Sequence, residues 1–227
     1  MLLDNTSLAK TIDNCNDRLF WGKPIREDER FEVVQWISQR QGLPRSYSGT
    51  FAPTDQDLAQ PLVLFTGEKV TTGAARSHIL GEEATQLLHS LAGDDPAVKA
   101  VIGHAMGNFL PSVEDWYCQH PSATGIFCCG TCTPAFWRNI GAGGLREKQE
   151  WLTNGIRILK THRKEDHQWK RFPFWWTVYA LISLDAPGVK DELSWVAPRL
   201  ERSLKRQPSD FYGERRRAVA ERVLARI

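Results

Sequence analysis

The chain has 227 residues, with 29 Lys and Arg against 27 Asp and Glu, so its formal net charge is +2. Its 41% hydrophobic and 25% charged residues are ordinary for a globular protein and exclude collagen-like, disulfide-dense and disordered chains. The charge balance gives no general reason to expect a nucleic-acid-binding protein or an acidic tail. We expect one domain over residues 1–227, with an N-terminal part, 1–73, and a helical part, 74–227.

The N-terminal part is expected to contain little regular structure. Apolar residues between Phe31 and Ile37 predict a helix that ends near Gly42. Residues 43–73 are rich in Gly, Pro, Ser and Thr and predict a long loop, in which 62–71 form a small β-hairpin. Such a loop either lines a site or packs as a surface segment, and the sequence leaves both possibilities open.

From residue 74 onward the sequence alternates two kinds of helix. The segments 133–141 and 173–185 are apolar on all sides, which is typical of helices enclosed by protein. The segments 145–162 and 188–206 carry one apolar stripe, which is typical of helices at the surface. Equivalent helices begin about 40 residues apart, a spacing found in helical-pair repeats.

A weaker pair of helices precedes these repeats, and a basic helix closes the chain at Ile227. In the weaker pair, 84–112, Gly93 ends one helix and Pro111 is expected to end the next. Alternation of enclosed and surface helices produces an inner and an outer layer. The sequence therefore predicts an all-α fold, an incomplete α/α toroid or a curved solenoid of paired helices with a long N-terminal loop.

Residues 132–137 read Cys-Thr-Pro-Ala-Phe-Trp, 143–145 read Gly-Gly-Leu, and 166–169 read Asp-His-Gln-Trp before the apolar segment. This stretch resembles the helical repeats of the prenyltransferase and squalene-cyclase superfamily, and the resemblance extends over roughly residues 84–185. It implies the architecture of an α/α toroid; an apolar, isoprenoid-like ligand is suggested separately by the aromatic residues described below. The sequence lacks an Asp-x-Asp-Asp acid motif, and His167 replaces the Gly of the family pattern, so no catalytic residue is transferred.

Four of the five cysteines lie between Cys118 and Cys132. Cys118, His120, Cys129 and Cys132 supply four ligands of the types that tetrahedral zinc prefers, which makes zinc a possible cofactor and leaves Cys128 outside the set. Two alternatives stay open. Free cysteines pack as small apolar groups, and Cys132, close to a helix N-terminus, can be a reactive thiol.

Two further groups are candidates for a small-molecule site. His78 and Glu82 are four residues apart on one helix face and can act as an acid/base pair or as a local hydrogen bond beside the core. An aromatic set on the two enclosed helices is expected to line a cavity that binds an apolar ligand, or else to form an ordinary core. The members of that set are Trp137, Phe174, Trp175, Trp176 and Tyr179.

The partner and the location follow from weaker signals. Arg215, Arg216 and Arg217 form a basic patch that can bind nucleic acid, although such patches are usually solvated helix faces. The longest uncharged apolar run, 172–184, is shorter than the roughly 20 residues of a membrane-spanning helix, and no signal peptide is recognisable, so we expect a cytoplasmic protein with reduced thiols.

Three functions compete at this stage. The first is a protein or enzyme that binds a small apolar ligand. The second is a helical-repeat scaffold that binds a protein partner. The third is a helical-repeat protein that binds nucleic acid, similar in size to the helical-repeat alkylpurine DNA glycosylases. The sequence alone does not decide whether the protein is an enzyme.

Overall fold

A computed structural model of the chain describes residues 1–145 and 148–227. Over these residues the fold is all-α, as predicted: ten α-helices, two short 3-10 helices and one two-stranded antiparallel hairpin. The α-helices are α1 Leu8–Phe20, α2 Glu27–Ser38, α3 Asp55–Ala59, α4 Gly73–Ala92, α5 Pro96–Gln119, α6 Thr133–Ala142, α7 Gln149–Thr161, α8 Phe174–Ile182, α9 Val189–Leu204 and α10 Phe211–Arg226. The shorter elements are η1 Tyr47–Gly49, η2 Pro121–Ala123, β1 Leu62–Val63 and β2 Lys69–Val70.

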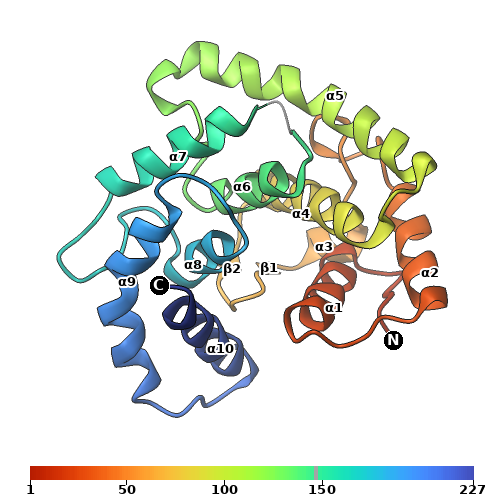
Figure 1. Ribbon diagram of the computed structural model, residues 1–227. Coiled ribbons are helices and arrows are strands. Elements are labelled where there is room, and N and C mark those ends of the chain that lie inside the picture. Colours follow the sequence, from red (N-terminus) through yellow and green to blue (C-terminus); the bar gives the residue numbers. More distant parts are fainter. Residues whose placement is uncertain (146–147) are drawn as a thin grey trace.

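The helices from α4 onward alternate between an interior and an exterior position (Figure 1). α4, α6, α8 and α10 contact one another in that order, while α5, α7 and α9 follow an arc outside them. α6 is buried from Thr133 to Ile140, and α8 is buried except at Trp175 and Ile182. The segments predicted to be enclosed are therefore enclosed, because a helix that is apolar on all sides must bury every face. Closure into a toroid stays a prediction.

Two features of the helical part differ from the expectations. The helix predicted to stop at Pro111 continues to Gln119, since α5 contains this proline in its interior. Proline removes one backbone hydrogen bond there, but Phe109 and Val113 on either side are fully buried, and their packing holds the helix together. Residues 146 and 147, within the predicted helix 145–162, lie outside the described residues; α7 begins at Gln149.

The N-terminal part contains more helix than expected and packs into the core. The helix predicted near residue 31 forms as α2, from Glu27 to Ser38. Two helices that were not predicted, α1 and α3, form in addition. The small hairpin forms as predicted, with Leu62 opposite Val70. Phe51 is fully buried, so this part of the long loop packs into the interior, while residues 42–45 are exposed. Over the described residues, no helix is both long and apolar enough to cross a membrane.

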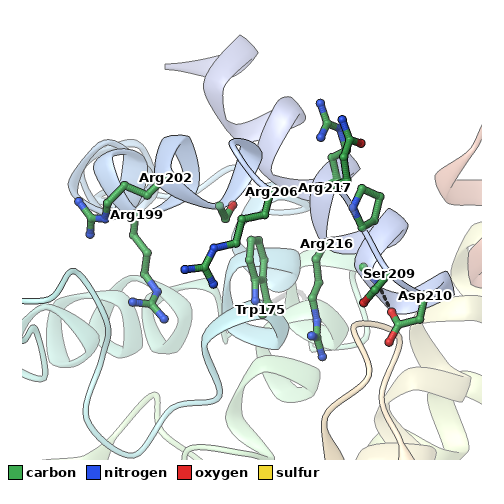
Figure 2. A pocket seen from close by; sticks show the side chains of 12 residues that line it. Trp175, Arg199, Arg202, Arg206, Ser209, Asp210, Arg216 and Arg217 are labelled. Atoms are coloured by element: carbon green, nitrogen blue, oxygen red, sulfur yellow. Dashed lines mark hydrogen bonds between the residues drawn. The ribbon is translucent and has the colours of Figure 1, made fainter.

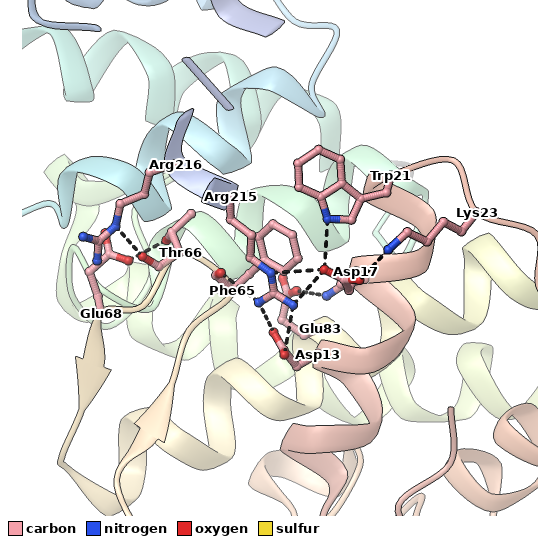
Figure 3. A network of polar contacts seen from close by, with 11 residues as sticks. Asp13, Asp17, Trp21, Lys23, Phe65, Thr66, Glu68, Glu83, Arg215 and Arg216 are labelled. Atoms are coloured by element: carbon pink, nitrogen blue, oxygen red, sulfur yellow. Dashed lines mark hydrogen bonds and ion pairs between the residues drawn. The ribbon is translucent and has the colours of Figure 1, made fainter. Parts of the chain in front are cut away.

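A polar network joins the two ends of the chain (Figure 3). Arg215 of α10 is 1% exposed and donates hydrogen bonds to Asp13 and Asp17 of α1 and to the carbonyl oxygen of Phe65, with distances of 2.7 to 3.3 Å. Its guanidinium also lies over the rings of Phe65 and Phe211, 4.0 and 4.1 Å from their centroids. α1 and α10 are thus held side by side.

Candidate metal centre

The strongest concentration of reactive side chains lies where α4 meets the segment before α6. The ligand atoms of His78, Cys128 and Cys132 all lie within 4.8 Å of one another. The Sγ atoms of Cys129 and Cys132 are 3.6 Å apart, and every cysteine of the chain is a free thiol. The cluster thus brings two sulfur atoms and one imidazole together from two distant parts of the sequence, and Cys129 adjoins it through Cys132.

The local backbone explains why the three sulfurs converge. Cys128 has φ of 60°, in the left-handed region that few residues other than glycine adopt. Gly130 packs so tightly on the carbonyl oxygen of Arg171 that a Cβ would lie 2.2 Å from it. Thr133 begins α6, and its hydroxyl donates to the carbonyl oxygen of Cys129 at 2.8 Å. A tight turn therefore wraps residues 128–132 around the start of the helix.

The histidine of the cluster is held by two aromatic rings. His78 is 8% exposed on α4; the ring of Tyr47 lies 3.7 Å from its centroid, and that of Phe127 lies 5.4 Å away. Burial lowers the pKa of His78 to about 4, so the imidazole is neutral at physiological pH. Within the described part of the chain, its buried Nδ1 has no hydrogen-bond partner. A neutral imidazole with an unused nitrogen is in the form that binds a metal ion.

The three thiols perturb one another in a way that favours a cation. Hydrogen bonding from the Cys128 and Cys132 thiols lowers the pKa of Cys129 to about 2. The hydrogen bond with Cys129 raises the pKa of Cys128 to about 11, and hydrogen bonds with Cys128 and Cys129, together with burial, raise the pKa of Cys132 well above its usual range. One of the three thiols ionises readily. A second thiolate is disfavoured because its negative charge would lie within a few ångströms of the first. A bound divalent cation removes that resistance, since thiolates are its natural ligands.

Distances between the sulfur atoms fit a metal better than a disulfide. A zinc ion with Zn–S bonds of about 2.3 Å in tetrahedral geometry separates two sulfurs by about 3.8 Å. A disulfide requires about 2.05 Å between the sulfurs. The 3.6 Å between Cys129 and Cys132 lies close to the tetrahedral value. Cys and His ligands select zinc or a comparable soft ion over calcium or magnesium, which require oxygen ligands.

The structure places the expected zinc ligands in two groups. Cys129 and Cys132 belong to the cluster, together with Cys128, which the sequence reasoning left over. Cys118 is exposed near the end of α5, outside the cluster. His120 follows it, stacks on Trp116 with centroids 4.5 Å apart, and shares a 3.0 Å hydrogen bond with the carbonyl oxygen of that residue.

The two members of the expected acid/base pair, His78 and Glu82, do not contact each other through a hydrogen bond. His78 and Glu82 lie on the same buried face of α4, but among the described residues neither Glu82 oxygen has a hydrogen-bond partner, so the two side chains do not bond to each other. Burial, reinforced by Glu83, raises the pKa of Glu82 well above its usual range and keeps the carboxyl neutral. His78 instead faces the thiols.

In the described part of the chain, members of the aromatic set border separate pockets. Trp137 is fully buried, and its indole nitrogen donates to the carbonyl oxygen of Gly125 at 2.7 Å. Trp176 lines a pocket of only about 30 Å³, Tyr179 borders one of about 330 Å³, and Trp175 lines a third, arginine-rich groove. Phe174, 9% exposed, packs against Trp169. Binding of an apolar ligand by this set stays a prediction.

The three consecutive arginines have different roles. Arg215 is enclosed by the network that joins α1 and α10. Arg217 pairs with Glu221 one turn along the same helix at 3.0 Å. Arg216 donates to the carbonyl oxygen of Thr66 at 2.7 Å and, with Arg217, lines the groove beside Trp175. Residues adjacent on a helix point in different directions, so the triplet does not form a single basic face.

Comparison with known proteins assigns the chain to no family: no family model matches it, and no solved structure matches it. The resemblance to the prenyltransferase and squalene-cyclase repeats therefore stays a prediction. The site rests on the geometry of the cluster alone.

Proposed function

We propose that this is a zinc-binding protein whose centre is formed by His78, Cys128, Cys129 and Cys132. The observation that carries the proposal is the convergence of three ligand atoms, from His78, Cys128 and Cys132, within 4.8 Å of one another. Cys129 supplies the fourth ligand, its sulfur being 3.6 Å from that of Cys132. A site with three thiolates and one imidazole is a common structural zinc site.

The position of the cluster explains what the zinc does for the protein. His78 belongs to α4, the cysteines belong to the turn before α6, and the Tyr47 ring that covers the imidazole comes from η1 in the N-terminal loop. A bound ion thus links α4 to the start of α6 beneath the loop. Structural zinc sites of this type contribute directly to folding free energy because the site does not exist in the unfolded chain.

The proposal is tested by metal content and by selective loss. Protein purified under reducing conditions is expected to contain one equivalent of zinc by elemental analysis. Cys132→Ser and His78→Asn are each expected to lose it, while Cys118→Ser, a cysteine change outside the cluster, keeps it. Chelation of the wild-type protein is expected to lower its thermal midpoint, because a ligand that binds only the folded state stabilises it.

Cobalt supplies a second readout that does not depend on variants folding. Metal-free wild-type protein titrated with Co²⁺ is expected to develop sulfur-to-cobalt charge-transfer absorption that saturates at one equivalent. Absence of zinc and cobalt binding in reduced, folded protein overturns the proposal, as does a stable disulfide between Cys129 and Cys132 in protein isolated from the cell. Loss of zinc on Cys118→Ser or His120→Asn would return the assignment to the ligand set expected from the sequence.

A further inference from the structure

A groove between α9 and α10 is lined by a cluster of arginines (Figure 2). Its volume is about 570 Å³, within the range of roughly 300–1,000 Å³ typical of small-ligand sites. Five arginines line it, against one carboxylate, Asp210. The arginines are Arg199, Arg202, Arg206, Arg216 and Arg217.

The protein itself neutralises this charge only in part: Arg217 pairs with Glu221 at 3.0 Å. The Asp210 carboxylate is engaged as the N-cap of α10, where it accepts a 2.6 Å hydrogen bond from the backbone of Gly213. Arg202 and Arg206 are exposed, and neither side chain makes a hydrogen bond or an ion pair with any residue that the structure describes. Like charges gathered in one groove repel one another, and a bound anion relieves that repulsion.

The side chains are arranged around a flat aromatic surface. Trp175 and Ile182 are the two residues of α8 that are only partly buried, and Trp175 lines the groove. Figure 2 shows Arg206 and Arg216 on either side of its indole ring. Arg216 is fixed in place by its 2.7 Å hydrogen bond to the carbonyl oxygen of Thr66. A rigid cation, mobile cations and an aromatic face therefore meet in one groove.

Each part of this arrangement matches one part of a nucleotide. The planar guanidinium group of arginine can donate two parallel hydrogen bonds to a pair of phosphate oxygens. A ligand with a single carboxylate would need fewer arginines than line this groove. A tryptophan face stacks on a nucleobase.

We propose that the groove between α9 and α10 binds a nucleotide carrying two or more phosphates, with its base stacked on Trp175. The phosphates are bound by Arg206 and Arg216, and Arg199 and Arg202 extend the positive surface on the α9 side. A single nucleotide fits the confined groove, and the net charge of the whole chain is only +2, so the basic character is local. This site is separate from the zinc centre and does not depend on it.

Isothermal titration of the purified protein, as isolated, with ADP tests the proposal. ADP is expected to bind at one site. Adenosine and inorganic pyrophosphate are each expected to bind at least ten-fold more weakly, because each lacks one half of the recognised chemistry. Arg206→Gln is expected to weaken ADP at least ten-fold without affecting folding, since this side chain has no partner in the described structure. Arg157→Gln, on α7 and outside the groove, is the matched control and leaves the affinity unchanged.

Trp175→Leu separates stacking from charge: it is expected to weaken ADP at least ten-fold and to leave pyrophosphate binding unchanged. Pyrophosphate binding as tightly as ADP overturns the nucleotide assignment. Equal effects of Arg206→Gln and Arg157→Gln show that the interaction is diffuse and also overturn it. Tighter binding of a ten-residue thymidine oligonucleotide than of ADP, with a steep loss in salt, overturns it in favour of single-stranded nucleic acid.

Discussion

The network around Arg215 predicts a large loss of stability when that arginine is removed. Arg215→Met deletes the hydrogen bonds to Asp13, Asp17 and the carbonyl oxygen of Phe65 while keeping an unbranched apolar side chain. Removing one partner of a buried ion pair costs about 3–5 kcal/mol. The Asp13 and Asp17 side chains are 32% and 20% exposed, so water partly compensates, and we expect the lower end, about 3 kcal/mol.

Urea denaturation followed by circular dichroism measures this loss. With a denaturant slope of about 2–3 kcal/mol/M, the midpoint of unfolding is expected to fall by about 1–1.5 M. Arg217→Met is the matched control on the same helix: its side chain is 36% exposed, pairs with the exposed Glu221 and donates one long hydrogen bond, 3.4 Å, to the carbonyl oxygen of Leu204, so its midpoint is expected to move by less than about 0.3 M.

A second substitution separates the ion pair from simple packing. Asp13→Asn is expected to destabilise the wild-type protein but to be neutral or stabilising when combined with Arg215→Met, because it then removes an unpaired charge. Equal midpoints for Arg215→Met and Arg217→Met would refute the conclusion that this network holds α1 against α10. So would strict additivity of Asp13→Asn and Arg215→Met.

Other parts of the structure give further expected outcomes. Gly125→Ala is expected to lower the free energy of unfolding by several kcal/mol, because φ is 96° and a Cβ would lie 2.2 Å from a backbone oxygen of α7. Gly22→Ala, with φ of 62° and open space around it, is expected to lower it by about 1 kcal/mol, and equal thermal midpoints for the two variants would contradict this. Burial raises the pKa of Cys15 to about 12, so iodoacetamide at pH 8 is expected to spare this thiol in folded protein and to modify it in urea, as read by mass spectrometry; alkylation of the native thiol at the unfolded rate would be inconsistent with its burial. Glu83→Gln leaves the 4% exposed Arg138 without its ionic partner and is expected to lower stability by about 3–5 kcal/mol in urea titration; a loss below about 1 kcal/mol would show that the pair is dispensable.

Helices with regular apolar spacing were predictable, and those with polar residues on the buried face were not. α6 and α8 are apolar enough that their enclosure follows from the sequence alone. α1 escaped prediction because its buried face includes Thr11 and Asn16, which interrupt the apolar stripe. Asn16 donates to the buried carboxylate of Glu83 at 3.3 Å, a partner 67 residues away that no local pattern reveals.

The candidate site was only half predictable for a related reason. The close spacing of the cysteines at 128–132 marks a possible metal site, but the choice of histidine depends on tertiary structure. His120 is near in sequence and turns away to stack on Trp116, whereas His78, 50 residues before Cys128, is brought to the thiols by the packing of α4 on α6. The arginine groove was predictable only in part: Arg216 and Arg217 belong to the basic patch expected from the sequence, whereas Trp175 of α8 and the arginines in and after α9 join them only in the folded chain.

X-ray absorption at the zinc edge tests the assigned ligand set most directly, because it reports the atoms bound to the metal. In zinc-loaded protein, His78, Cys128, Cys129 and Cys132 predict three sulfur atoms at about 2.3 Å and one nitrogen at about 2.0–2.1 Å. A shell made only of nitrogen and oxygen, or an unchanged spectrum in Cys132→Ser, would contradict the assignment.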